Sequence, residues 1–359
     1  MTYHIAVLPG DFIGPEVVEA TIRALEAMQR THGLAFEFER LPFGGGAIDS
    51  HGEPLPQVTK DACTRADAVL MGSAGGPVGD HPWNRLPREK RVESGILALR
   101  RHLKVFANLR PVKVFAGLER LSPLKESVAR GTDLLILREL TGGIYFGKPS
   151  YAHDDQGLST MVYDRYEVER IARVAFETAR QRRNKVTNVD KSNVLDVSQF
   201  WRDVVVGVHQ TEFPDVELDH LYVDNAAMQL VRAPTEFDVV VTGNLFGDIL
   251  SDLAAVIPGS LGVLPSASLG GDVGLYEPVH GSAPDIAGKG IANPVGTLLS
   301  AAMMLRHGLG EGEAADALEA AVQTALGEDA TVDLGGGRGT DAFADAVIRA
   351  LETAAAPTT

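Results

Sequence analysis

The stretch VVVTGNLFGDILSD, residues 239–252, decides the fold class of this chain. Its first four residues form a short run of branched apolar side chains, which is typical of a strand buried on both faces. Gly243 ends the run, and the residues that follow have apolar side chains at helical spacing. A buried strand that passes directly into a helix is the repeating unit of α/β proteins.

The same alternation continues on both sides of this stretch. Short apolar runs at 5–8, 68–71 and 134–137 predict further buried strands. Pro15 lies just inside a periodic helical pattern that ends near Arg30. Longer helical patterns occur at 168–182, 193–206, 294–307 and 314–326. We therefore predict an α/β protein with a mostly parallel sheet covered by helices.

Composition excludes several classes of partner. The 359 residues are 45% hydrophobic, which is enough for a large buried core, and their formal net charge is −15. Nucleic-acid binding depends on clustered Lys and Arg, so no nucleic-acid partner is expected. The sequence has no long apolar run and no basic amphipathic stretch, so no membrane partner is expected. Residues 1–10 lack a signal-peptide pattern, and with the single Cys63 this favours a cytoplasmic location.

Two acidic residues of the opening stretch indicate a metal site. Asp248 and Asp252 are four residues apart, so their carboxylates lie on one face of the helix and repel each other unless a cation joins them. Ligands that are all oxygen atoms favour Mg²⁺ or Mn²⁺ over zinc. Asp224 follows another apolar run and is a candidate third ligand, although taken alone it also fits a helix cap. The alternative for the pair is two exposed helix aspartates.

Three arginines lie beside apolar segments, at Arg100, Arg110 and Arg138. A guanidinium group holds a carboxylate through paired hydrogen bonds, so three converging arginines suit a substrate with two carboxylates. Taken singly, each arginine fits a surface salt bridge equally well.

Two further residues carry proton chemistry. Lys191 follows a strand-like run, and strand ends are where sites form in α/β proteins. Near a divalent cation this lysine could serve as a base. Tyr145, in the run GGIYFG at 142–147, could donate a proton, and a half-buried structural tyrosine is the alternative.

Two glycine-rich matches fail on their context. Residues 142–148 have the spacing of a phosphate-binding loop, but Pro149 stands where Ser or Thr must reach Mg²⁺. Residues 337–342 match a dinucleotide fingerprint, yet too little chain follows them to complete the βαβ unit. Neither an NTPase nor a Rossmann dinucleotide site is expected.

Four stretches, at 139–147, 189–195, 242–252 and 277–294, together resemble the β-decarboxylating dehydrogenase family of isocitrate and isopropylmalate enzymes. The resemblance extends from Ile5 to about Leu351. It implies an isopropylmalate dehydrogenase-like two-domain fold, not a Rossmann fold. The implied NAD-binding domain comprises residues 1–105 and 259–359, and residues 106–258 form a domain for dimerisation, metal and substrate.

The resemblance also implies roles for single residues. Arg100, Arg110 and Arg138 would bind the malate carboxylates, and Ile96, Leu97 and the partner's Val194 would line an apolar pocket for the third substituent. Asp248, Asp252 and the partner subunit's Asp224 would hold Mg²⁺ or Mn²⁺. Tyr145 and the partner's Lys191 would transfer protons, so the active unit is expected to be a homodimer.

NAD is the implied cofactor, and its expected contacts lie in two regions. Ser73 and Glu277 are expected near the nicotinamide, and Asp285 is expected to accept hydrogen bonds from the ribose hydroxyls. The residues expected to line the adenosine are His280, Gly281, Ser282, Ala283, Pro284, Asp285 and Asn293.

One position departs from the family pattern. Phe12, in the run GDFIGPE at 10–16, stands where the family usually has glycine. Glycine there provides either positive φ or thinness near the cofactor, so Phe12 would weaken NAD binding or reshape the cleft edge. The alternative is a turn whose angles suit any residue.

The implied reaction is the NAD-linked oxidative decarboxylation of a malate with an apolar substituent, with 3-isopropylmalate expected first. Homoisocitrate, isocitrate, tartrate and D-malate are alternative substrates in the same family. A non-catalytic regulatory subunit is a further alternative, but such a subunit would lack some of Lys191, Tyr145 and the acidic trio, all of which are present.

Overall fold

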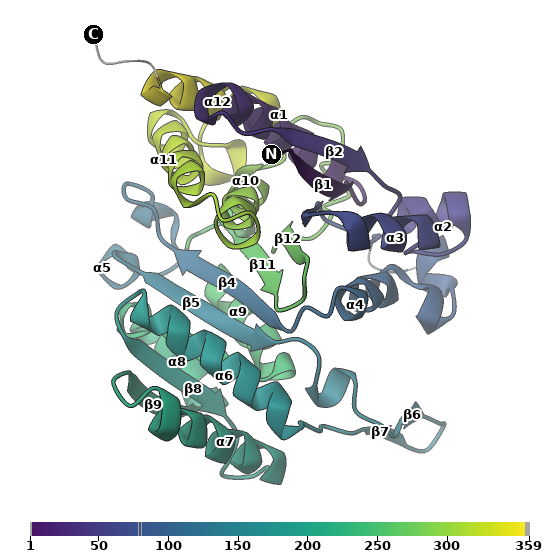
Figure 1. The fold of residues 1–359 in the computed structure, drawn as a ribbon, viewed down its shortest axis with the longest axis vertical. Coiled ribbons are helices and arrows are strands. Elements are labelled where there is room, and N and C mark those ends of the chain that lie inside the picture. The colour runs from purple at the N-terminus through teal and green to yellow at the C-terminus, as the bar shows by residue number, and fades with distance from the viewer. Residues whose placement is uncertain (1, 78, 80, 356–359) are drawn as a thin grey trace. The chain divides into compact units, whose positions relative to one another are not determined.

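The computed structural model describes residues 2–77, 79 and 81–355, which form two compact units. Unit 1 comprises residues 1–105 and 260–359, and unit 2 comprises residues 106–259 (Figure 1). Strands alternate with helices in both units, which confirms the predicted α/β class. No helix in the described part of the chain is both long and apolar enough to cross a bilayer.

Unit 1 contains a stretch of sheet with the strand order β2-β1-β3-β12-β11. Its strands are β1 (Tyr3–Leu8), β2 (Phe36–Arg40), β3 (Ala68–Met71), β11 (Pro265–Leu269) and β12 (Gly274–Pro278). Its helices are α1 (Gly14–His32), α2 (Gly45–His51), α3 (Gln57–Arg65), α4 (Val92–His102), α10 (Val295–Met303), α11 (Gly312–Glu328) and α12 (Thr340–Ala355). Short 3₁₀ turns lie at Pro82–Arg85, Arg88–Lys90, Leu261–Val263 and Val332–Leu334, and a π turn at Met304–Gly308 continues α10.

Unit 2 contains the strand order β4-β5-β10-β8-β9. Its strands are β4 (Ala107–Lys113), β5 (Asp133–Glu139), β8 (Lys185–Asp190), β9 (Glu217–Tyr222) and β10 (Val239–Thr242), with a separate hairpin of β6 (Ser150–Ala152) and β7 (Gly157–Ser159). Its helices are α5 (Glu126–Ala129), α6 (Arg165–Arg180), α7 (Asp196–Glu212), α8 (Val223–Arg232) and α9 (Asn244–Ala255). Single 3₁₀ turns lie at Glu119–Leu121, Gly143–Tyr145 and Pro234–Glu236.

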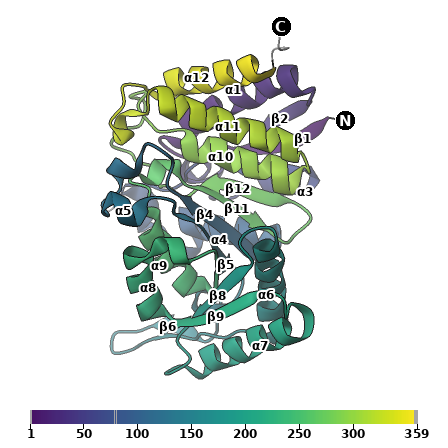
Figure 2. The ribbon, with the colours of Figure 1, turned by 90° about the vertical axis from the view of Figure 1, so that its left-hand side faces the viewer.

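Parallel pairing dominates both units, as predicted. In unit 2 the strands β5, β10, β8 and β9 are parallel, and α6 and α7 cover one face while α8 and α9 cover the other (Figure 2). Strands covered on both faces bury all their side chains, which explains the uninterrupted apolar runs of β3 and β10. Each unit also has an antiparallel pair that the sequence did not predict, β11 with β12 and β4 with β5.

Candidate active site

Two of the predicted arginines lie together in unit 2. Arg138 is near the end of β5 and is buried, and Arg110 lies on the antiparallel neighbour β4. Arg138 forms an ion pair with Asp248, and Nη1 of Arg110 lies 3.0 Å from Oδ1 of Asp252. The same Nη1 is 3.9 Å from Oδ1 of Asp248, so one guanidinium group faces both aspartates. The two carboxylates therefore share a face of α9, as their spacing predicts.

The sequence suggested that a metal ion offsets the repulsion between Asp248 and Asp252. Within the chain, Arg110 and Arg138 already offset part of it. The side chains of Asp248 and Asp252 are nevertheless 33% and 67% exposed, so oxygen atoms remain open to a further ligand. These hard oxygen donors on one helix face suit a divalent cation such as Mg²⁺ or Mn²⁺. The donor set therefore fits the metal that the sequence predicts, in the chemistry of its atoms.

Tyr145 lies beside the same carboxylates. It ends the 3₁₀ turn Gly143–Tyr145, and its hydroxyl donates a hydrogen bond of 2.9 Å to Oδ2 of Asp248. Partial burial and this hydrogen bond raise the pKa of Tyr145 above the usual value of a tyrosine. The guanidinium carbon of Arg138 lies 5.7 Å from the centre of the ring. The phenol is therefore held in its protonated form between a carboxylate and a cation.

Lys191 and Asp224 form a second group in unit 2. Nζ of Lys191 lies 2.6 Å from Oδ1 of Asp224, which is in the first turn of α8. The hydrogen bond from Lys191 lowers the pKa of Asp224, so the carboxylate is ionised. No group of three metal-capable side chains occurs among residues 2–77, 79 and 81–355. Within one chain, then, Asp224 does not join Asp248 and Asp252.

Three buried residues near Arg138 were not selected from the sequence. Glu139 and Asn244 hydrogen-bond Gly142, in the loop that leads to Tyr145, and the hydroxyl of Tyr163 accepts a hydrogen bond from the backbone N–H of Asn244. The hydrogen bonds of Tyr163 and Asn244 join residues that are more than 80 positions apart in the sequence. No local pattern could therefore have revealed them. The one local signal was the polar Asn244, which follows a buried strand after a single glycine.

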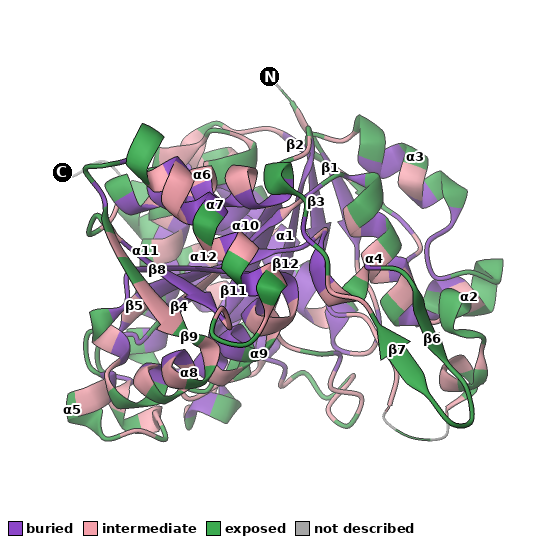
Figure 3. Ribbon diagram, turned by 90° about the horizontal axis from the view of Figure 1, so that it is seen from below, coloured by how far each residue is buried: buried purple, intermediate pink, exposed green. Residues whose placement is uncertain are grey.

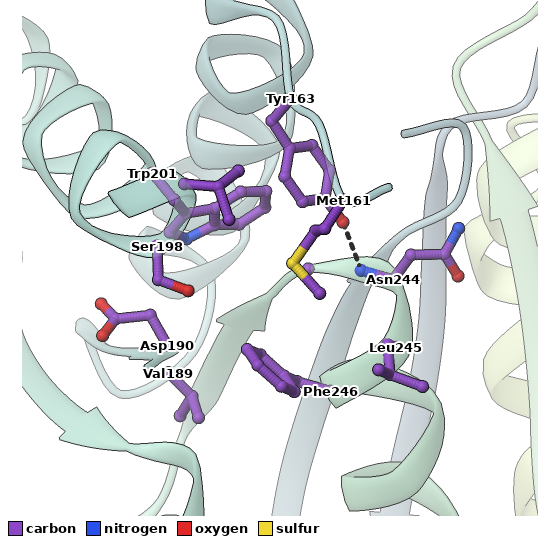
Figure 4. A pocket seen from close by; sticks show the side chains of 11 residues that line it. Met161, Tyr163, Val189, Asp190, Ser198, Trp201, Asn244, Leu245 and Phe246 are labelled. Atoms are coloured by element: carbon purple, nitrogen blue, oxygen red, sulfur yellow. Dashed lines mark hydrogen bonds between the residues drawn. The ribbon is translucent and has the colours of Figure 1, made fainter. Parts of the chain in front are cut away.

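A pocket in unit 2 adjoins this group (Figure 4). Its lining is mainly apolar and aromatic and consists of Met161, Tyr163, Val189, Asp190, Val197, Ser198, Trp201, Gly243, Asn244, Leu245 and Phe246. None of the predicted site residues lines it. The nearby Val194, predicted for a pocket wall, is 69% exposed.

In unit 1, Arg100 lies on α4 and binds Glu277 of β12. Nη2 of Arg100 is 2.9 Å from Oε1 of Glu277, and both side chains are largely buried. Ile96 and Leu97, one turn earlier on the same helix, are partly exposed. Arg100, which was predicted to bind the substrate, therefore lies beside Glu277, which was predicted to lie near the nicotinamide.

The turn at the end of β1 requires the backbone conformation that favours glycine. Phe12 has φ of 52°, in the left-handed region. Its flanks are fixed, because Asp11 N donates to Ser73 O at 2.8 Å and Ile13 N donates to Ser282 O at 3.1 Å. The alternative that any residue suits this turn is therefore wrong. The ring of Phe12 lies 6.0 Å from that of Trp83.

The loop from His280 to Asn293 begins next to this turn. Ala283 packs with Ile286 and Ala287 against the buried Ile13 and Val17, while Gly281 and Asp285 are exposed. The Oδ1 atom of Asn293 accepts from Val295 N at 3.0 Å, and its Nδ2 donates to Asp333 at 3.0 Å. Asn293 thus already has structural partners.

Two buried polar atoms of unit 1 bear on the cofactor. Ser73 Oγ and His280 Nε2 have no hydrogen-bond partner in the described part of the chain. Burial also lowers the pKa of His280, which keeps the ring neutral. Buried polar atoms without partners are costly unless a ligand meets them. These atoms therefore fit a polar ligand such as a dinucleotide; Ser282, in contrast, donates to Gly75 O at 2.9 Å.

Comparisons with known proteins show the family to which the chain belongs. The profile of the family described as isocitrate/isopropylmalate dehydrogenase matches residues 4–347. A Salinibacter ruber protein named 3-isopropylmalate dehydrogenase is 56% identical over 99% of this chain and 96% of its own length. Its Wolinella succinogenes counterpart is 55% identical over 91% of this chain and 90% of its own length. The crystal structure of isocitrate dehydrogenase from Methylococcus capsulatus has a TM-score of 0.84 and 37% identity, covering 97% of this chain and 99% of that chain. These matches confirm the resemblance and the two-domain α/β fold class expected from it.

Proposed function

The chain belongs to the isocitrate/isopropylmalate dehydrogenase family, and on that premise we propose that it oxidises and decarboxylates 3-isopropylmalate with NAD. The product is 4-methyl-2-oxopentanoate, in leucine biosynthesis. The observation that carries the proposal is the cluster of Tyr145, Arg110 and Arg138 around Asp248, because it combines a proton donor with cations suited to a dicarboxylate. A regulatory subunit has no use for such a cluster.

Substrate binding falls to the arginines. The guanidinium groups of Arg110 and Arg138 would bind the malate carboxylates through paired hydrogen bonds, and Arg100 of unit 1 would supply the third contact. Arg138 is well suited because it is buried, and a cation in a site of low dielectric binds an anion more strongly than one in water.

Asp248, Asp252 and the partner subunit's Asp224 would hold the divalent cation, Mg²⁺ or Mn²⁺. When bound, this cation would supply Lewis-acid polarisation of the substrate's 2-oxygen, and NAD would supply the acceptor for the hydride of carbon 2. The partner's Lys191 would take the proton of the 2-hydroxyl. Tyr145 would then give its phenolic proton to carbon 3 after CO₂ leaves. The raised pKa of Tyr145 keeps that proton available at neutral pH.

A homodimer is part of the proposal, because α8 and α9 expose several large apolar side chains. Met228 of α8 and Ile249 of α9 are 61% and 57% exposed, and Val231 of α8 and Val256, directly after α9, are exposed as well. The hairpin of β6 and β7 is exposed along both strands (Figure 3). A second copy seated on these helices would cover the apolar side chains and bring the missing carboxylate of Asp224. Sedimentation should give the mass of a dimer, and Ile249→Lys should lower that mass and the activity together.

We also propose a cytoplasmic location and a dinucleotide site in unit 1. The single cysteine is a buried free thiol, which suits a reducing compartment. Ser73, Glu277 and the loop from His280 to Asn293 would contact NAD, with Asp285 facing the ribose hydroxyls.

A panel of 3-substituted malates tests the substrate. An isopropyl group that meets Ile96, Leu97 and the partner's Val194 would gain about 0.8 kcal/mol for each of its three carbons, which is roughly fiftyfold in all over malate. Isocitrate and homoisocitrate should be poorest, because their extra carboxylate would be buried without a cation. Rates at fixed NAD and Mn²⁺ should therefore fall from 3-isopropylmalate through other alkylmalates to malate. A preference for a tricarboxylate, for tartrate or for D-malate would contradict the proposed substrate.

A further inference from the structure

Asn244 is the first residue of α9 and is 1% exposed. It lies between two parts of the candidate site that are far apart in sequence. Its backbone N–H donates a hydrogen bond of 2.7 Å to the hydroxyl of Tyr163, which Figure 4 marks with a dashed line. The main chain at this helix end is therefore anchored, and the side chain leaves a fixed point.

The side-chain oxygen of Asn244 orients Arg138. Oδ1 accepts hydrogen bonds from Nε and Nη2 of that arginine, at 3.1 and 2.9 Å. The remaining terminal nitrogen, Nη1, binds Asp248. An acceptor that contacts two nitrogens of one planar guanidinium fixes the plane of the group. Asn244 thereby sets the direction in which Arg138 can meet a carboxylate.

The side-chain nitrogen of Asn244 holds the loop that carries Tyr145. Nδ2 donates to the carbonyl oxygen of Gly142 at 3.2 Å, directly before the turn Gly143–Tyr145. The N–H of Gly142 is held as well, by the buried carboxylate of Glu139 at 2.7 Å. Both polar groups of one peptide residue are thus fixed by two side chains.

Tyr163 and three glycines make this arrangement tight. A Cβ atom added at Gly142, Gly143 or Gly243 would lie 2.7, 2.5 or 2.8 Å from an atom of Tyr163. Such distances are too short for a side chain, so the loop can pack here only with glycine. The loop therefore has little freedom to compensate for a lost hydrogen bond to Asn244.

We propose that Asn244 is a positioning residue that couples the orientation of Arg138 to the position of Tyr145. The side-chain amide of Asn244 contacts both Arg138 and the loop of Tyr145, so a change at this amide affects both substrate binding and proton donation. The inference rests on the proposed function, which assigns the carboxylate contact to Arg138 and the proton to Tyr145.

Asn244→Asp separates the two contacts. The carboxylate keeps an acceptor for Arg138 but cannot donate to Gly142, whose carbonyl oxygen it repels. We expect kcat to fall about tenfold, the loss that follows from one hydrogen bond broken at a buried group, with KM for the malate changed by less than about threefold. The solvent deuterium isotope effect on kcat should rise, because proton donation from a displaced Tyr145 becomes limiting.

Asn244→Ala removes both contacts. We expect KM to rise about tenfold and kcat to fall about tenfold, because Arg138 then has two buried N–H groups without their acceptor. Thr242→Val is the matched control, since the buried hydroxyl of Thr242 donates to Val189 O at 2.7 Å instead. It should lower the unfolding temperature while leaving KM and kcat within twofold of the parent.

The pattern across the three variants decides the matter. Equal effects of Asp and Ala on KM, or an unchanged isotope effect in the Asp variant, would overturn the coupling. The comparison uses whichever 3-substituted malate the parent enzyme turns over best. A parent that prefers another malate therefore refutes the proposed substrate without affecting this test. Should Asn244→Ala fail to fold, the near-isosteric Asp variant still provides the isotope effect and the ratio of kcat to KM.

Discussion

The two units treat their polar side chains differently. In unit 2 the candidate acid–base and substrate residues already bind one another, through the contacts of Asp248 with Arg138 and Tyr145 and of Lys191 with Asp224. In unit 1 the candidate cofactor region leaves Ser73 Oγ and His280 Nε2 buried and without a partner in the described part of the chain. The candidate reacting groups of unit 2 thus already have partners within the chain, whereas the candidate cofactor region keeps polar atoms that a ligand would satisfy.

The strongest test of the unit 2 arrangement is Tyr145→Phe. Loss of a general acid lowers kcat by roughly 10²- to 10⁴-fold, while KM should change little because the arginines remain. The raised pKa of Tyr145 keeps its phenol protonated through the neutral range, so the parent kcat should not fall there through loss of this proton. Steady-state rates from pH 6 to 10 measure both effects.

Tyr151→Phe is the matched control for this change. Tyr151 lies on β6 with a similar exposure, and its hydroxyl binds Gln156. Its variant should keep the parent rates. A Tyr145→Phe enzyme with normal kcat would show that the contact with Asp248 is only structural.

Removal of the metal should have the next largest effect. Excess chelator should abolish turnover, and Asp248→Asn should lower kcat by about 10²- to 10³-fold, as expected for loss of a main electrostatic stabiliser. Mn²⁺ titration should show a higher metal requirement in this variant. Asp203→Asn, which removes an exposed carboxylate from α7, is the control. Full activity in chelator would mean that Arg110 and Arg138 offset the two aspartates without a metal.

In unit 1 the expected effect is on cofactor choice. The exposed Asp285 would lie near the 2′-phosphate of NADP, and a like-charge pair at about 4 Å costs on the order of 1–4 kcal/mol. NAD should be preferred by at least fivefold, and Asp285→Asn should narrow that preference. The preference for NAD over NADP can also be measured without turnover. The fluorescence of Trp83 and Trp201 monitors the binding of each dinucleotide to the enzyme in the absence of substrate. Equal affinities in the parent would refute the role given to Asp285, and Asp272→Asn should leave the ratio unchanged.

The smallest effect concerns Phe12 and its positive φ. Ala and Gly substitutions both remove the ring, so their difference isolates backbone strain. Phe12→Gly should be about 1 kcal/mol more stable than Phe12→Ala in urea unfolding, because only glycine adopts the left-handed region without cost. At Phe38, in β2, the order should reverse, since glycine weakens an ordinary strand by about 0.5–1 kcal/mol. The same order at both positions would show that the turn relaxes.

The sequence predicted the elements whose pattern is set by burial. The fully buried strands β3 and β10 have the predicted bounds, whereas β4 and β11 were missed because they contain Asn108, Arg110, Ser266 and Ser268. These polar side chains can be buried because they are hydrogen-bonded, and residue type alone does not reveal that.

The candidate site follows the same division. Local spacing predicted that Asp248 and Asp252 share a helix face, and the family motif at 10–16 identified Phe12 as unusual. Spacing could not reveal that Arg110 would face both aspartates or that Asn244 would join Arg138 to Gly142, because those contacts depend on how distant strands pair. The roles of the site residues stay predictions.

The chain's one cysteine is a probe of local unfolding in unit 1. Cys63 is fully buried in α3, and burial raises the pKa of its thiol to about 12. A thiol reagent needs an accessible thiolate, so it should label this residue only in molecules in which α3 has come away from the sheet. Unit 2 contains no cysteine, so local unfolding of unit 2 produces no labelling by the same reagent. The labelling rate therefore measures local unfolding of unit 1 alone. A dinucleotide that binds Ser73 Oγ and His280 Nε2 should lower this rate.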